Sequence, residues 1–127
     1  MTASGELIFV YGSLRRAARD PMYRMLDHRI EFIGFGTFRG KLYDFGSHPG
    51  VVPSPDEADC VTGEVYELHD PDKAFPILDG YEGNKYRREK HPIALEDGDT
   101  VQAWIYIYIA PTENARRIES GDYLSSE

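Results

Sequence analysis

The sequence predicts an α+β fold, in which a small, mostly antiparallel β-barrel carries short helices in its connections. Segments with strand character outnumber segments with helical character along the chain. Residues 30–46 are rich in aromatic side chains and interrupted by glycines, and glycines within strands mark the bulges and bends by which a small sheet closes on itself. Residues 86–95 and 100–109 form a β-hairpin pattern around the turn sequence EDGD.

The domain organisation follows from length and composition. The 127 residues are most simply one domain, residues 1–127, and 41% hydrophobic content is typical of an ordinary globular protein. A chain of this size can bury a substantial core without disulfides. No repeat or linker interrupts it, and we expect about 112–127 to form a polar tail over the surface.

The net charge of −8 limits the class of partner. Nucleic-acid binding needs a basic face, so nucleic acid is not expected as the partner. The chain shows neither a secretory signal pattern nor an apolar run long enough to span a bilayer, so no membrane partner is expected. The single cysteine, Cys60, excludes an internal disulfide and fits a reducing cytoplasm. A small-molecule partner remains, and no oligomeric state is predicted.

The remaining strand pattern begins with a strand over residues 6–11. Residues 60–68 alternate well enough for a second strand, with Val61 and Val65 on one face and Glu64 on the other. Residues 47–59 contain three prolines, and they are expected to form a loop between strands.

Two short helices are expected in the connections. The first begins at Pro21 and runs to about His28, because proline is tolerated at the first helical position. The second covers residues 71–79, with Phe75 and Leu78 facing inward, and Gly80 is expected to end it.

The first strand ends abruptly at Gly12 and Ser13. A turn of this kind exposes successive backbone N–H groups, and Gly12 has no Cβ to block the approach of an anion or a carbonyl oxygen. Leu14 is suited to anchor the turn to the core, and Arg15 adds positive charge beside it. The glycine patterns of a phosphate loop and of a dinucleotide-binding turn are both absent.

Five pieces of sequence occur in a specific order: FVYGSLR, HPGVVP, VTGEVYEL, LDGYEGNKYRR, and AWIYIY followed by ESGDY. In this order and spacing they resemble the gamma-glutamylcyclotransferase-like family, which includes gamma-glutamylamine cyclotransferases and related bacterial proteins. The resemblance extends from Ile8 to Tyr123, nearly the whole chain.

The resemblance implies a compact barrel-like fold with a cavity at its mouth. It also implies an enzyme that releases 5-oxoproline by attack of the substrate's α-amino group on its own γ-carbonyl, without a metal or an organic cofactor. Glu82 matches the family's catalytic acid/base. The substrate's glutamyl part is then held by the turn residues Tyr11, Gly12, Ser13 and Leu14.

A carboxylate suits this chemistry. At neutral pH the α-amino group of the substrate is mostly protonated, so a nearby carboxylate must first accept a proton and can later donate one to the departing amine. Tyr81 and Tyr86, beside Glu82, can supply an apolar wall that raises the pKa of this carboxyl group.

Other residues compete for these roles. Asp79 is the main alternative base, although a carboxylate near a helix end commonly fixes the following loop instead. Arg15 is a candidate partner for the substrate's α-carboxylate. Tyr86 and Tyr106 are candidates to line the cavity, and strand tyrosines are also common packing residues.

The cysteine and histidines point to ordinary structural roles. Cys60 is expected to be a small buried thiol. The histidines show no metal-ligand spacing with one another or with Cys60. Residues 85–90 are basic, which is typical of a solvated strand end, and capture of an acidic substrate is the alternative.

A serine hydrolase is disfavoured because GxSxG is missing. The other function class is a non-catalytic binding or interaction module on the same fold.

Overall fold

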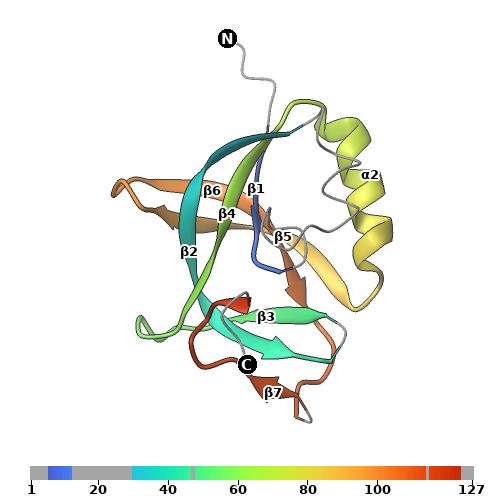
Figure 1. Cartoon of the computed structure of the whole chain (residues 1–127). Coiled ribbons are helices and arrows are strands. Elements are labelled where there is room, and N and C mark those ends of the chain that lie inside the picture. The colour runs from blue at the N-terminus through green and yellow to red at the C-terminus, as the bar shows by residue number, and fades with distance from the viewer. Residues whose placement is uncertain (1–5, 13–29, 47, 114, 124–127) are drawn as a thin grey trace.

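The computed structural model describes residues 6–12, 30–46, 48–113 and 115–123. The elements in chain order are β1 (Glu6–Val10), β2 (Ile30–Asp44), β3 (Pro49–Pro53), β4 (Cys60–Leu68), α2 (Pro71–Glu82), β5 (Tyr86–Leu95), β6 (Thr100–Tyr108) and β7 (Arg116–Arg117). The helix expected from Pro21 to His28 lies outside the described residues. Figure 1 shows α2 along one side of the strands.

The strands form a closed barrel. The hydrogen-bonded order is β2–β4–β1–β6–β5, and β5 pairs back onto β2 to complete the circle. All neighbouring pairs in this circle are antiparallel except β1 and β6, which are parallel. The predicted α+β fold class, a small mostly antiparallel barrel, is therefore confirmed.

The long strand β2 makes the closure possible. Its pairing with β4 shifts register between Phe32 and Gly34, which is the irregularity expected of a glycine-rich strand that bends. Beyond that point β2 pairs with β5, then with β3 and β7. One bent strand thus carries both the barrel and the short strands outside it.

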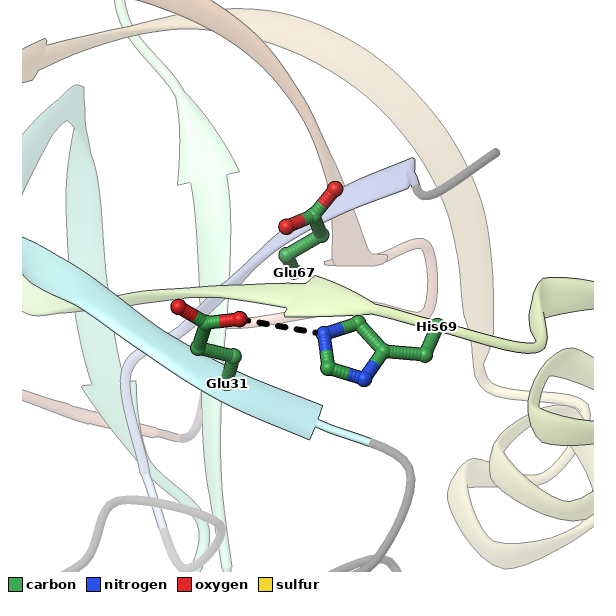
Figure 2. Close-up of side chains that lie close together, drawn as sticks. All are labelled: Glu31, Glu67 and His69. Carbon is green, nitrogen blue, oxygen red and sulfur yellow. Dashed lines mark hydrogen bonds and ion pairs between the residues drawn. The ribbon is translucent and has the colours of Figure 1, made fainter. Parts of the chain in front are cut away.

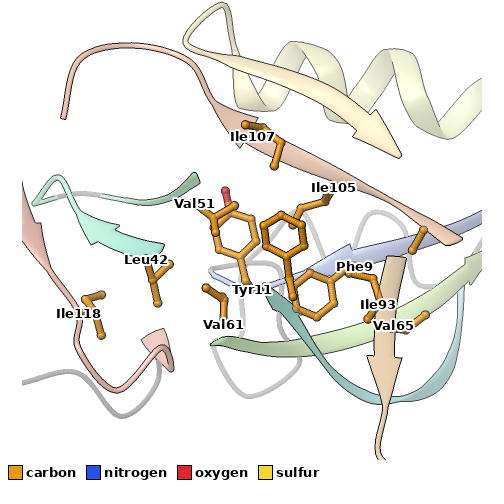
Figure 3. Close-up of a cluster of buried hydrophobic side chains, with 12 residues drawn as sticks. Phe9, Tyr11, Leu42, Val51, Val61, Val65, Ile93, Ile105, Ile107 and Ile118 are labelled. Carbon is orange, nitrogen blue, oxygen red and sulfur yellow. The ribbon is translucent and has the colours of Figure 1, made fainter. Parts of the chain in front are cut away.

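Two apolar clusters follow from the alternation of side chains along β1. Phe9 and Tyr11 point into the barrel, where they pack with residues such as Val65 and Ile105 (Figure 3). Ile8 and Val10 point the other way and pack under α2. The buried face of α2 is formed by Ala74, Phe75 and Leu78. The prediction that Phe75 and Leu78 face inward is therefore confirmed.

The predicted loop over residues 47–59 is wrong in its first half. Residues 49–53 form β3, which pairs with β2 in the register Leu42↔Val51. Prolines stand at both ends of this strand, where the missing N–H groups do not interrupt the ladder, and Val51 between them is fully buried.

The expected end of the second helix is also wrong. The helix continues through Gly80 to Glu82 and ends at Gly83, whose φ of 87° is the left-handed conformation that glycine adopts readily. The N–H of Gly83 donates to the Asp79 carbonyl at 3.0 Å. Glu82 therefore lies on the last turn of a helix and not in a loop.

Two further predictions need correction. The thiol of Cys60, expected to be buried, is exposed at the first residue of β4. The tail, expected over the surface, contributes β7 and buries Ile118 in the barrel cluster. A Cβ at Gly121 would overlap the Cys60 carbonyl oxygen, so this part of the tail lies directly on β4.

Within the described ranges, no helix is long and apolar enough to cross a membrane.

Acid should destabilise the fold. Hydrogen bonds from neighbouring donors hold the pKa of several carboxyl groups below their usual values, namely those of Glu6, Asp44, Asp59, Asp79 and Glu89. Because each folded-state pKa is lower than the unfolded one, the stabilisation is present above about pH 4 and is lost as the pH falls further. Thermal unfolding between about pH 6 and pH 2.5 should show a falling midpoint below about pH 4. The decline should be shallower in Asp79→Asn, and an equally steep decline in that variant would exclude a contribution from Asp79.

Candidate active site

One cavity of about 420 Å³ opens at one end of the barrel. Its walls come from four places in the chain: the end of β1, the start of β3, the segment from the end of α2 to the start of β5, and one residue of β6. The lining residues are Phe9, Val10, Tyr11, Gly12, His48, Pro49, Tyr81, Glu82, Gly83, Asn84, Lys85, Tyr86 and Tyr106.

The end of β1 is held firmly in place. The Tyr11 ring is buried in the barrel cluster, and its hydroxyl donates to the Tyr106 carbonyl oxygen at 2.7 Å. The side chain of Tyr11 is therefore an anchor, and the strand end contributes to the cavity beside it. A Cβ added at Gly12 would overlap Cγ of Pro49, so Gly12 is the residue that lets β1 and β3 approach closely.

Glu82 lines the same cavity from the end of α2. The helix that carries it is fixed under β1 and β6 by Phe75 and Leu78. Glu82 is partly buried, and its negative charge contributes to raising the pKa of Tyr11 and Tyr86 after the larger effect of burial. For the pKa of Tyr106 its contribution comes after burial and the hydrogen bond to Asp79. The carboxylate thus lies among the tyrosines that line the cavity.

Tyr86 joins two walls of the cavity. Its hydroxyl donates to the Pro49 carbonyl oxygen at 2.5 Å, so the first residue of β5 is tied to the first residue of β3. Its ring also lies edge-on to His48, with centroids 6.1 Å apart. Tyr86 therefore shapes the cavity through its ring while its hydroxyl proton is engaged elsewhere.

Asp79, the competing carboxylate, is occupied by other partners. Its Oδ1 accepts hydrogen bonds from Arg88 Nε at 3.0 Å and from the Tyr106 hydroxyl at 2.6 Å. Its Oδ2 accepts a bond from Arg88 Nη2 at 3.2 Å. The Arg88 bonds, followed by the Tyr106 bond, lower the pKa of Asp79, which makes it a weak proton acceptor.

Several predicted site residues can now be placed. Tyr11, Gly12, Glu82 and Tyr86 line the same cavity, as does Tyr106. Ser13, Leu14 and Arg15 lie outside the described residues. The basic segment 85–90 is largely ion-paired, because Arg87 pairs with Glu89, Arg88 with Asp79, and Lys90 with Glu6. These pairs favour the solvated strand end over the capture of an acidic substrate.

The sequence predicted cavity walls from residues 47–59, but it did not single out His48 and Pro49. His48 and Pro49 line the cavity at the start of β3, a strand that the sequence did not predict. His48 also stacks on Phe45, with ring centroids 5.6 Å apart. The available signal was the segment HPGVVP, which carried part of the family resemblance but was interpreted as a loop.

A second cluster of polar side chains occurs on the barrel wall (Figure 2). Glu31 and Glu67 face each other across β2 and β4, and His69 Nε2 lies 3.2 Å from Glu31 Oε1. The three residues each offer one ligand atom, and these atoms lie within 4.8 Å of one another. The spacing of the histidines and Cys60 along the chain does not reveal this cluster, because it depends on the register between β2 and β4. Glu31 and His69 are exposed, and such groups are common on surfaces without a metal.

The chain matches one family model and several known proteins. The family model described as gamma-glutamyl cyclotransferase, AIG2-like, matches residues 8–125. A gamma-glutamylcyclotransferase family protein of Escherichia coli strain K12, YtfP, is 31% identical over 121 residues, covering 94% of this chain and 97% of YtfP. A gamma-glutamylaminecyclotransferase of Mus musculus is 33% identical over 119 residues, covering 78% of this chain and 75% of the mouse protein.

The fold is similar to that of a solved relative. The solution NMR structure of Escherichia coli YtfP superposes with a TM-score of 0.66 at 31% sequence identity, covering 94% of this chain and 96% of YtfP. The cavity described above therefore belongs to a fold that other members of this group share.

Proposed function

Because this chain belongs to the AIG2-like gamma-glutamyl cyclotransferase family, we propose that it is an enzyme that cyclises a gamma-glutamyl amide and releases 5-oxoproline and a free amine. The observation that carries the proposal is the cavity, which the partly buried Glu82 lines together with the end of β1 at Tyr11 and Gly12. A proton acceptor and a strand end with backbone donors are the two parts that this reaction needs.

In the proposed reaction Glu82 serves as base and then as acid. It accepts a proton from the substrate's α-ammonium group, and the neutral amine attacks the γ-carbonyl carbon to form the ring C–N bond. The tetrahedral intermediate then collapses, the original amide C–N bond breaks, and Glu82 returns the proton to the departing amine. One carboxylate is sufficient because the nucleophile and the leaving group meet at the same carbon.

The enclosure of the site contributes to the rate. The γ-glutamyl chain must fold back on itself before its amine can attack, and a cavity that holds this shape removes an entropic barrier. Tyr11, Tyr86 and Tyr106 line the cavity walls together with Glu82, and burial raises the pKa of each hydroxyl further above neutral pH, so these groups stay protonated. These walls orient the substrate and leave proton transfer to Glu82.

The end of β1 is proposed to bind the glutamyl part of the substrate. Its backbone N–H groups are suited to the α-carboxylate or to the oxyanion of the tetrahedral intermediate. The proposal includes Ser13, Leu14 and Arg15, by the family resemblance alone. No step requires a metal or an organic cofactor, and the single cysteine is consistent with our proposal of a cytoplasmic location.

A panel of gamma-glutamyl amines, gamma-glutamyl amino acids and dipeptides tests the function. We expect 5-oxoproline to appear with at least one class of leaving group, at a rate unchanged by a metal chelator. Glu31→Ala serves as a matched control, because it removes one carboxylate from the cluster of Glu31, Glu67 and His69 and does not change the cavity lining. Binding of panel members without any 5-oxoproline would instead establish the binding-module function.

A further inference from the structure

Tyr106 contacts both halves of the proposed site. Its backbone carbonyl accepts the hydrogen bond from the buried Tyr11 hydroxyl at 2.7 Å, which holds the end of β1. Its own hydroxyl donates to Asp79 Oδ1 at 2.6 Å, which holds the last turns of α2. One residue of β6 is therefore bonded to the wall that is proposed to bind the glutamyl group and to the helix that carries Glu82.

The bond to the helix is reinforced by Arg88. The guanidinium group of Arg88 bonds both oxygens of Asp79 and lies 3.9 Å from the ring centroid of Phe75, on the same helix. Because Asp79 stands three residues before Glu82, the two side chains are neighbours on one helical turn. A bidentate pair of this kind fixes direction as well as distance.

We propose that Tyr106, acting with Asp79 and Arg88, is a positioning residue that sets the separation between the Glu82 carboxylate and the end of β1. The inference rests on the proposed function, and it deepens that function by naming what holds the base against the substrate. The attack needs the amine, the carbonyl and the base within a few tenths of an ångström of their reacting places, so a small displacement of the helix end costs rate.

Tyr106 fits a positioning role better than proton transfer. Its hydroxyl proton is already directed to Asp79, and the residue is only 5% exposed. The two bonds of Tyr106 leave from different atoms, the side-chain hydroxyl and the backbone carbonyl. They can therefore be removed separately, the first by Tyr106→Phe and the second by Tyr11→Phe.

The two variants should affect different kinetic constants. Tyr106→Phe keeps the ring and the Tyr11 bond but releases the helix end, so kcat should fall about ten- to a hundredfold while KM changes less than about twofold. Tyr11→Phe releases the end of β1, so KM should rise while kcat changes less. Tyr108→Phe is the matched control, since it removes a hydroxyl two residues along β6 for which the described residues offer no hydrogen-bond partner, and it should keep normal kinetics.

Amide hydrogen exchange gives a readout that does not need turnover. Tyr106→Phe should raise exchange at residues 81–84, including the Gly83 amide that donates to the Asp79 carbonyl, and leave β1 protected. Asp79→Asn should do the same, and the double variant should lose little more than either single one. If Tyr106→Phe matches Tyr108→Phe in kcat and in exchange, the positioning role is excluded. If the native protein forms no 5-oxoproline while Tyr106→Phe still raises amide exchange at residues 81–84, the proposed function fails. In that case the role of Tyr106 in holding the end of α2 stands.

Discussion

Glu82→Gln should abolish nearly all turnover while the protein remains folded. Glutamine keeps the shape and the hydrogen-bonding capacity of glutamate but cannot accept the proton of the substrate's α-ammonium group. Losing a general base costs on the order of 10²–10⁴ in rate, and the upper end is expected here because the same group also acts as the acid. Formation of 5-oxoproline should be measured together with ligand affinity, which should change little, and with the melting temperature.

Asp79→Asn is the matched comparison for Glu82→Gln. It makes the same chemical change three residues earlier on the same helix, but it weakens a contact to Arg88 and Tyr106 instead of removing the base. Its melting temperature should fall, and its loss of turnover should stay at least tenfold smaller than that of Glu82→Gln. A well-folded, inactive Asp79→Asn beside an active Glu82→Gln would assign the base to Asp79.

Gly12→Val should remove substrate binding and lower stability. Already the first carbon of a side chain at this position would overlap Cγ of Pro49, so β1 and β3 must separate where both line the cavity. Overpacking of this kind typically costs about 1–3 kcal/mol. Gly34→Val is the control, because a Cβ there has no neighbour within 4 Å and the residue lies outside the cavity lining, so affinity should be nearly unchanged.

A rescue separates two reasons for the Gly12 effect. Gly12→Ala should impair binding, and Pro49→Ala in the same chain should restore much of it if the overlap with the proline ring is the cause. Without restoration, the side chain at residue 12 acts by covering the backbone N–H groups, as the sequence alone suggested. Full activity of Gly12→Val would place the glutamyl-binding wall elsewhere in the cavity.

Local patterns were sufficient for most of the barrel. The hairpin of β5 and β6 and the strand β4 are predicted to within a residue, because alternation and turn sequence report directly on short-range structure. The end of α2 was not predictable in this way. Gly80 is a plausible stop by itself, but burial of Leu78 and the bonds of Asp79 to β5 and β6 carry the helix on to Glu82.

The sequence could indicate residues of the candidate site, but not the strand pairing and hydrogen bonds that hold them together. The family resemblance placed Glu82 and the turn at Gly12 in one site, and both line one cavity. A wall from residues 47–59 was expected as a loop, because proline-rich stretches favour loops, whereas pairing with β2 makes residues 49–53 a strand. The Tyr11 and Tyr106 bond joins residues far apart in the chain, so no local pattern contains it.

The central place of β1 has a consequence for how the chain matures. This strand precedes both of its partners in the chain, β4 and β6, and β6 ends at Tyr108. The barrel cannot close during synthesis until residues up to Tyr108 have been made, and until then the apolar segment Leu7–Val10 lacks one of its two neighbouring strands. Folding dominated by such distant pairings is slow, and the exposed strand is open to aggregation during that time. Because β1 and β6 both line the cavity, the site cannot form until β6 has been synthesised.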